Sequence, residues 1–120
     1  MKEDKGFEIA LEIANIKKEN FKNYKNIAKR IKEILKDLIN DNSLRVIVFG
    51  SVVRGNYNIL SDIDILVITE KADKINYGEI VDKLYEKLGK SFIGVELHIV
   101  TPEKFENWYK KFLDVYEEIN

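Results

Sequence analysis

The stretch FGSVVRGNYNILSDIDILVIT, residues 49–69, places a Gly-Ser pair directly after one apolar run and sets Asp62 and Asp64 at alternate positions of the next. Alternate residues of a strand point to the same face, so the two carboxylates would project together, with their Cα atoms roughly 6.6 Å apart. Burying two carboxylates side by side is unfavourable unless a positive charge lies between them. The stretch therefore predicts a strand that presents two acidic side chains to a cation.

Strands are expected on both sides of this turn. Residues 45–49 (RVIVF) are a short β-branched run, typical of a strand buried on both faces, and the run stops at Gly50. Residues 62–69 (DIDILVIT) predict a second strand. Residues 92–100 predict a third, which Gly94 interrupts.

The remaining segments show the apolar spacing of helices. Residues 7–38 predict two helices or one bent helix that ends near residues 40–42, and residues 77–88 predict a helix that Gly89 closes. Thr101 as N-cap and Pro102 at the first helical position open a last helix. Its apolar stripe is expected to lie in the core and consists of Phe105, Trp108, Tyr109, Phe112 and Tyr116.

This order of elements predicts an α+β or α/β domain. A chain of 120 residues with 45% hydrophobic content can bury one core and is too short for two, so we expect a single domain over residues 1–120. It would comprise an N-terminal helical segment over about residues 5–40, a core over about 44–100 and a C-terminal helix over about 102–117.

Charge and composition exclude several classes of protein. The 20 basic residues nearly balance the 21 acidic ones, so net charge gives no reason to expect binding to nucleic acid or to an anionic membrane. No apolar run approaches the length of a membrane span, and the N-terminus lacks a signal-peptide pattern, so we expect a soluble cytoplasmic protein. Without cysteine there is no thiolate site, and a metal would be held by oxygen or by His98.

A third carboxylate is expected near the first two. Glu96 and His98 would share one face of the third strand, and pairing of that strand beside the second would bring Glu96 to Asp62 and Asp64. Three carboxylates with oxygen-only ligation favour Mg²⁺.

The Gly-Ser pair predicts a phosphate site beside that cation. Gly50 ends a strand and Ser51 would start a short helix, whose free backbone N–H groups and hydroxyl suit a phosphate, while Arg54 adds a positive charge. Phosphate donors beside metal-binding carboxylates indicate a site for a nucleoside triphosphate and Mg²⁺. Such a site performs phosphoryl or nucleotidyl transfer, commonly with two metal ions about 3.5–4 Å apart.

Three competing motifs do not fit. A P-loop would need Lys and Ser or Thr where Asn56 and Tyr57 stand, and an EF-hand would need a ligand at Leu66. A glycosidase pair of carboxylates gives no role to the Gly-Ser turn.

Three pieces of the chain, spanning about residues 45–100, together resemble the signature of the minimal nucleotidyltransferases of the DNA polymerase β superfamily. They are Gly50-Ser51-x-x-Arg54-Gly55, then Ser61-Asp62-x-Asp64, then a carboxylate in a later strand. The resemblance implies a small mixed β-sheet flanked by helices. It also implies transfer of a nucleoside monophosphate from a nucleoside triphosphate to a hydroxyl, with release of pyrophosphate.

The resemblance assigns roles to individual residues. Asp62 and Asp64 would hold the metals, and Glu96 would bind the second metal and serve as general base. The nucleotide would be bound by Gly50, Ser51, Arg54 and Ser61. The sequence departs from the family at Glu96, where Asp is more usual.

Short members of this family are often encoded beside a HEPN-domain protein as toxin and antitoxin pairs, and some antitoxins transfer AMP to a tyrosine of the toxin. The resemblance thus implies a protein adenylyltransferase that uses ATP and a HEPN-type partner. In 120 residues there is no room for domains that grip nucleic acid, so nucleic acid is not expected as the main acceptor. The alternative is a non-catalytic module that binds nucleotide or partner and that neutralises or scaffolds a HEPN-like protein. The oligomeric state, including a homo-oligomer, stays open.

Structural explanations compete with these roles. The two aspartates would suit an edge strand, Glu96 a solvated strand position and His98 a partly buried sheet position. Residues 17–36, with eight basic and two acidic side chains, would suit a solvated helical face, or RNA or an acidic partner. Exposure of Trp108 or Tyr109 would turn the last helix into a docking surface.

Overall fold

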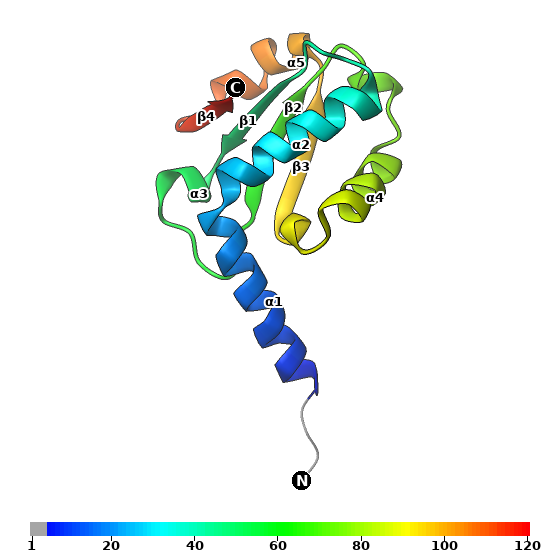
Figure 1. Ribbon diagram of the computed structural model, residues 1–120. Helices are drawn as coiled ribbons and strands as arrows, with labels where there is room; N and C mark the ends of the chain where they lie inside the picture. Colours follow the sequence, from blue (N-terminus) through cyan, green and yellow to red (C-terminus); the bar gives the residue numbers. More distant parts are fainter. Residues whose placement is uncertain (1–4) are drawn as a thin grey trace.

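The computed structural model describes residues 5–120, in which four strands form one sheet of order β3-β2-β1-β4. The strands are β1 (Arg45–Phe49), β2 (Ile63–Ile68), β3 (Val95–Val100) and β4 (Tyr116–Ile119). β2 and β3 are parallel, whereas β1 is antiparallel to both β2 and β4. This mixed sheet, flanked by helices, confirms the expected fold class (Figure 1).

Five α-helices accompany the sheet in the described residues. They are α1 (Lys5–Lys22), α2 (Tyr24–Ile39), α3 (Ser51–Arg54), α4 (Tyr77–Leu88) and α5 (Pro102–Asn107). Of the two alternatives for residues 7–38, two helices or one bent helix, the structure has two helices with the break at Asn23, and α1 extends away from the sheet (Figure 1). Over residues 5–120 no helix is both long enough and apolar enough to span a bilayer.

The two faces of the sheet are covered differently. α2 and α4 bury one face in the main core, where Ile31, Leu35 and Leu84 are fully buried. The other face carries a smaller cluster, in which Phe105 of α5 packs with Ile47 and Leu66. Because side chains alternate along a strand, Asp64 shares this second face with Leu66. The acidic residues of β2 and β3 therefore lie on the less covered side of the sheet.

The predicted strands over residues 62–69 and 92–100 are each shorter in the structure. β2 begins at Ile63, so Asp62 lies just before it. The third strand begins only at Val95, because residues 89–92 form a 3₁₀ helix and Gly94 adopts a φ of +87°.

The predicted helix over residues 102–117 is wrong beyond Asn107. It starts as expected, with the Thr101 side chain accepting a hydrogen bond from the Lys104 N–H (3.2 Å). It ends at Asn107, a 3₁₀ turn spans Tyr109–Lys111, and the chain then returns as β4 to pair with β1. Pairing satisfies the free edge of β1 and buries Ile119, which helical continuation would not achieve.

The aromatic stripe of that segment is consequently divided. Phe105 is 1% exposed, as expected for the core, but Trp108 is 58% exposed and Phe112 is 70% exposed. The expectation that the whole stripe is core is therefore wrong.

Candidate active site

The Gly-Ser turn joins β1 to the four-residue helix α3. Gly50 is the N-cap with φ +82° and ψ −156°, a backbone conformation that is essentially restricted to glycine. Ser51 begins α3, as predicted, and the carbonyl of Gly50 accepts hydrogen bonds from the N–H groups of Val53 and Arg54 (both 3.2 Å).

The same glycine lies against the aspartate of β2. A Cβ atom on Gly50 would be 2.5 Å from Oδ2 of Asp64, which is too close for any side chain. The register explains the contact, because Phe49 is paired with Asp64 across β1 and β2. The turn and the acidic strand are thus parts of one site.

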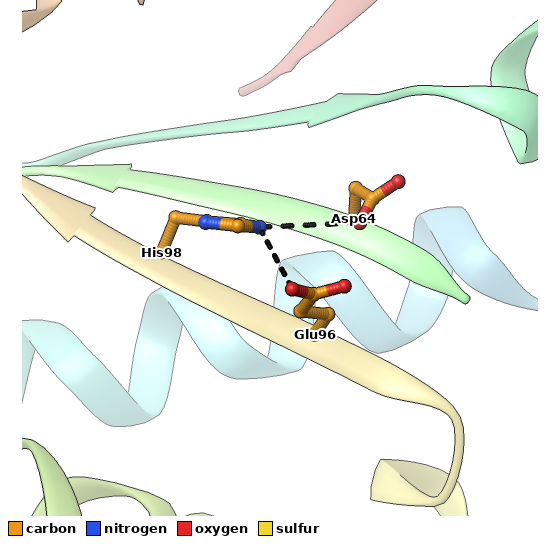
Figure 2. Close-up of side chains that lie close together, drawn as sticks. All are labelled: Asp64, Glu96 and His98. Atoms are coloured by element: carbon orange, nitrogen blue, oxygen red, sulfur yellow. Dashed lines mark ion pairs between the residues drawn. The ribbon is translucent and has the colours of Figure 1, made fainter.

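Three titratable side chains gather on β2 and β3. Asp64 is paired with Glu96 across the parallel strands, and His98 follows Glu96 on the same face of β3. Nε2 of His98 lies 3.9 Å from Oδ1 of Asp64 and 3.7 Å from Oε1 of Glu96 (Figure 2). The imidazole ring also packs against the Phe49 ring, with centroids 5.6 Å apart. From the sequence, Asp64 and Glu96 are expected to lie together, whereas His98 is expected at a partly buried sheet position. The structure places His98 beside both carboxylates.

Electrostatics link the three groups. Asp64 raises the pKa of His98, and the charge on Glu96 raises it further, whereas partial burial acts in the opposite direction. A positive imidazolium between two carboxylates is one answer to their mutual repulsion.

A divalent cation would also offset the repulsion between the carboxylates, and these three side chains offer suitable ligand atoms. One ligand atom from each of Asp64, Glu96 and His98 lies within 4.8 Å of the other two. Carboxylate oxygens suit Mg²⁺, and the imidazole nitrogen adds a donor that transition metals prefer.

Asp62 lies apart from this group. It precedes β2, and its side chain is 50% exposed. Its Oδ1 is 4.0 Å from Nζ of Lys17 on α1, and the same ammonium donates to the carbonyl of Ile59 (2.9 Å). Nothing in the sequence indicated this contact, because it joins α1 to a distant loop.

Arg54 and Ser61 each have a partner within the protein. Nη1 of Arg54 is 3.1 Å from Oδ1 of Asp114, in the segment that leads to β4. Ser61 closes a turn, because its Oγ accepts from the N–H of Asn58 (3.0 Å) and its own N–H donates to the carbonyl of Asn58 (2.9 Å).

A cleft of about 470 Å³ is lined by four of these positions, whereas Asp62 and Glu96 line another pocket of about 280 Å³ beside Tyr77. One wall contains Gly50, Arg54, Asp64 and His98. The C-terminal segment contributes the rest of the lining, a second wall that includes Trp108, Phe112 and Asp114. Sequence reasoning missed this second wall, since it assigned the aromatic residues to the core.

Comparisons with known proteins identify the family that the chain resembles. The family model described as "Nucleotidyltransferase domain" matches residues 28–118. A crystal structure described as a "putative nucleotidyltransferase" is 32% identical, with 77% of this chain and 96% of that chain covered and a TM-score of 0.50. Another with the same description, from Sulfolobus solfataricus, is 19% identical, with 98% and 87% covered and a TM-score of 0.45. The comparison with curated proteins finds no match.

Proposed function

The chain belongs to the nucleotidyltransferase domain family, and from that premise we propose that it transfers AMP from ATP to a hydroxyl group with release of pyrophosphate. One observation carries the proposal: Gly50, Arg54, Asp64 and His98 line a single cleft. Its volume of about 470 Å³ lies within the usual range of small-molecule sites.

The phosphates would lie at the Gly-Ser turn. The backbone at Gly50 leaves no side chain between the turn and Asp64, so a phosphate oxygen can approach both. Ser51 offers its N–H and hydroxyl, and Arg54 offers a guanidinium that pairs well with phosphate. Ser61 would contribute to the nucleotide site by holding the loop before Asp62, through its two contacts with Asn58.

Asp64 and Glu96 would hold Mg²⁺, with Asp62 as a further ligand. A cation bound there supplies positive charge to the phosphate oxygens, and a second ion is expected in this chemistry. Asp62 must turn away from Lys17 to take part. An ion pair this long and half exposed is worth less than about 1 kcal/mol, so it opposes that rotation only weakly.

Group transfer requires a base for the acceptor. The acceptor oxygen attacks the α-phosphorus, the bond from that phosphorus to the pyrophosphate oxygen breaks, and the hydroxyl proton passes to a carboxylate. We assign this role to Glu96, whose side chain is about half exposed and thus accessible to an acceptor.

We assign the acceptor hydroxyl to a HEPN-type partner protein, which makes the chain an antitoxin. The support is the resemblance to short nucleotidyltransferases that are encoded beside such partners. The exposure of Glu96 agrees with it, because a protein hydroxyl can reach the carboxylate proposed as the base.

A second candidate function is a module that binds nucleotide and partner without chemistry. The observation that favours it is the contact of Asp62 with Lys17, which leaves Asp62 outside the group formed by Asp64, Glu96 and His98 in residues 5–120.

The two functions are separated with ATP labelled in its α-phosphate, incubated with Mg²⁺ and an extract of the host. Wild type is compared with the double variant Asp62→Asn, Asp64→Asn and with Asp73→Asn, a change at an exposed aspartate outside the cleft. We expect label on a discrete protein band from wild type and Asp73→Asn, and none from the double variant. Label in RNA would contradict the protein acceptor. No transfer, in an extract shown to contain the partner, would support the non-catalytic module.

A further inference from the structure

Two exposed aromatic rings line the same cleft as Asp64. Trp108 and Phe112 are 58% and 70% exposed, and their ring centroids are 5.3 Å apart with an interplanar angle of 54°. Large apolar side chains gathered at an exposed, polar-rimmed site usually mark a binding surface. The phosphate and metal functions assigned above give these rings no role.

The rings are held in place by the neighbouring residues. Phe105 is buried against the sheet, and Tyr109 and Leu113 are partly buried in the same cluster. Trp108 and Phe112 immediately precede Tyr109 and Leu113, so anchoring those two residues fixes the direction of the exposed rings. Beyond them, β4 joins the segment to β1.

The other lining residues define what a ligand would meet beside these rings. Gly50, Arg54 and Asp64 contribute polar groups to the cleft, and the aromatic pair contributes apolar surface. A ligand that contacts both carries an anionic group at one end and a flat apolar group at the other. A nucleoside triphosphate has this form, since its base offers a π-face to an aromatic ring.

We propose that Trp108 and Phe112 bind the base of the nucleotide by stacking. This inference rests on the proposed function, because it takes the phosphates to lie at the Gly-Ser turn. The aromatic pair then adds affinity for ATP that inorganic triphosphate lacks, because inorganic triphosphate has no base to stack. A protein partner that covers the same rings is the competing explanation.

Intrinsic fluorescence tests the contact directly, because Trp108 is the only tryptophan of the chain. Wild-type protein is titrated with ATP and, separately, with inorganic tripolyphosphate, both in the presence of Mg²⁺. We expect ATP to change the tryptophan emission, and tripolyphosphate to compete with ATP while leaving the emission nearly unchanged. If ATP binds without changing the emission, the base lies elsewhere and the proposal fails.

Calorimetry on variants provides the second test. Trp108→Leu should weaken ATP binding roughly 5- to 100-fold and leave tripolyphosphate binding unchanged, with Trp108→Phe in between. Leu11→Ala, which removes a side chain of similar exposure (50%) from α1, should behave as wild type. Melting curves verify that each variant is folded.

The outcomes separate the stacking proposal from the proposed nucleotidyl transfer on which it rests. Equal ATP affinity in wild type and Trp108→Leu would overturn the stacking site while tripolyphosphate binding upheld the phosphate site. Absence of binding of both ligands to wild type would overturn both. If the variant bound ATP normally but lost its protein partner, the rings would be a docking surface instead.

Discussion

A Cβ atom on Gly50 would lie 2.5 Å from Oδ2 of Asp64, so the turn after β1 and the acidic side chain of β2 are packed as closely as a glycine permits. The contact joins two residues that belong to different elements of the chain, the turn after β1 and strand β2. Any side chain at position 50 must displace the carboxylate proposed to hold the metal.

Gly50→Ala is expected to impair both stability and transfer. Its φ of +82° and ψ of −156° would cost a non-glycine residue about 1–3 kcal/mol in unfolding free energy. Displacement of Asp64 should abolish the stabilisation by Mg²⁺ and ATP, which for wild type at a hundred times the Kd is about 2.7 kcal/mol. Urea unfolding with and without Mg²⁺ and ATP measures both effects.

Gly55→Ala is the matched control for that variant. Gly55 also has a positive φ (+81°), but nothing lies within 4 Å of the Cβ it would gain. It should lose stability and keep the ligand effect. Loss of the ligand effect in both variants would show that backbone strain, and not the contact with Asp64, is responsible.

The local part of this site could be predicted from the sequence. The alternation of Asp62 and Asp64 and the end of an apolar run at Gly50 are short-range signals. The elements β1, α3 and β2 form close to where these signals indicate. The proximity of Glu96 to Asp64 needed one further assumption, that the third strand pairs with the second, and the parallel register confirms that pairing.

The parts that could not be predicted depend on contacts between distant segments. Residues 102–117 carry a helical stripe, but pairing of β4 with β1 overrides it, and local propensity contains no information about that partner. The contact of Lys17 with Asp62 and that of Arg54 with Asp114 likewise join segments that no short-range pattern relates.

Asp114→Asn is expected to tighten ATP binding. The carboxylate of Asp114 engages Arg54 in the free protein, and both side chains are exposed. An exposed pair of this kind contributes little, and the substitution also removes a negative charge from a cleft proposed to hold phosphates. Calorimetry should therefore show a modest gain in ATP affinity, and a fall in affinity would mean that Asp114 holds Arg54 in its binding position.

Tyr24→Phe is expected to destabilise the fold and to alter its response to alkaline pH. The hydroxyl of Tyr24 donates to Glu117 of β4, and removing a hydrogen bond to a charged group costs about 1.5–3 kcal/mol. Burial, followed by Glu117, raises the pKa of Tyr24 from 10.0 to about 12. The stabilisation is therefore complete below pH 10 and is lost as the pH rises toward 12.

Urea unfolding across this alkaline range provides the measurement for Tyr24. The stability difference between wild type and Tyr24→Phe should shrink as the pH rises, whereas Tyr85→Phe, at an exposed tyrosine of α4, should change little at any pH. A difference that stays constant to pH 12 would contradict the linkage to Tyr24 ionisation.

Glu118→Gln tests the attachment of β4 at acid pH. Nε and Nη2 of Arg45 donate to the two oxygens of Glu118 (2.8 and 2.7 Å), and this pairing lowers the pKa of the Glu118 carboxyl. Both side chains are about 40% exposed, so the loss of stability at neutral pH should be only about 0.2–1 kcal/mol.

The pH dependence of this contribution follows from the pKa of Glu118. Because the pKa in the folded protein is the lower one, the contribution is complete above the unfolded value of about 4.3 and disappears as the pH falls through the folded value. From neutral pH to about pH 3, the stability of wild type should therefore fall toward that of Glu118→Gln. A control such as Glu70→Gln should match wild type at every pH in this range. A variant as stable as wild type at neutral pH would show that the pair of Arg45 and Glu118 adds nothing to the attachment of β4.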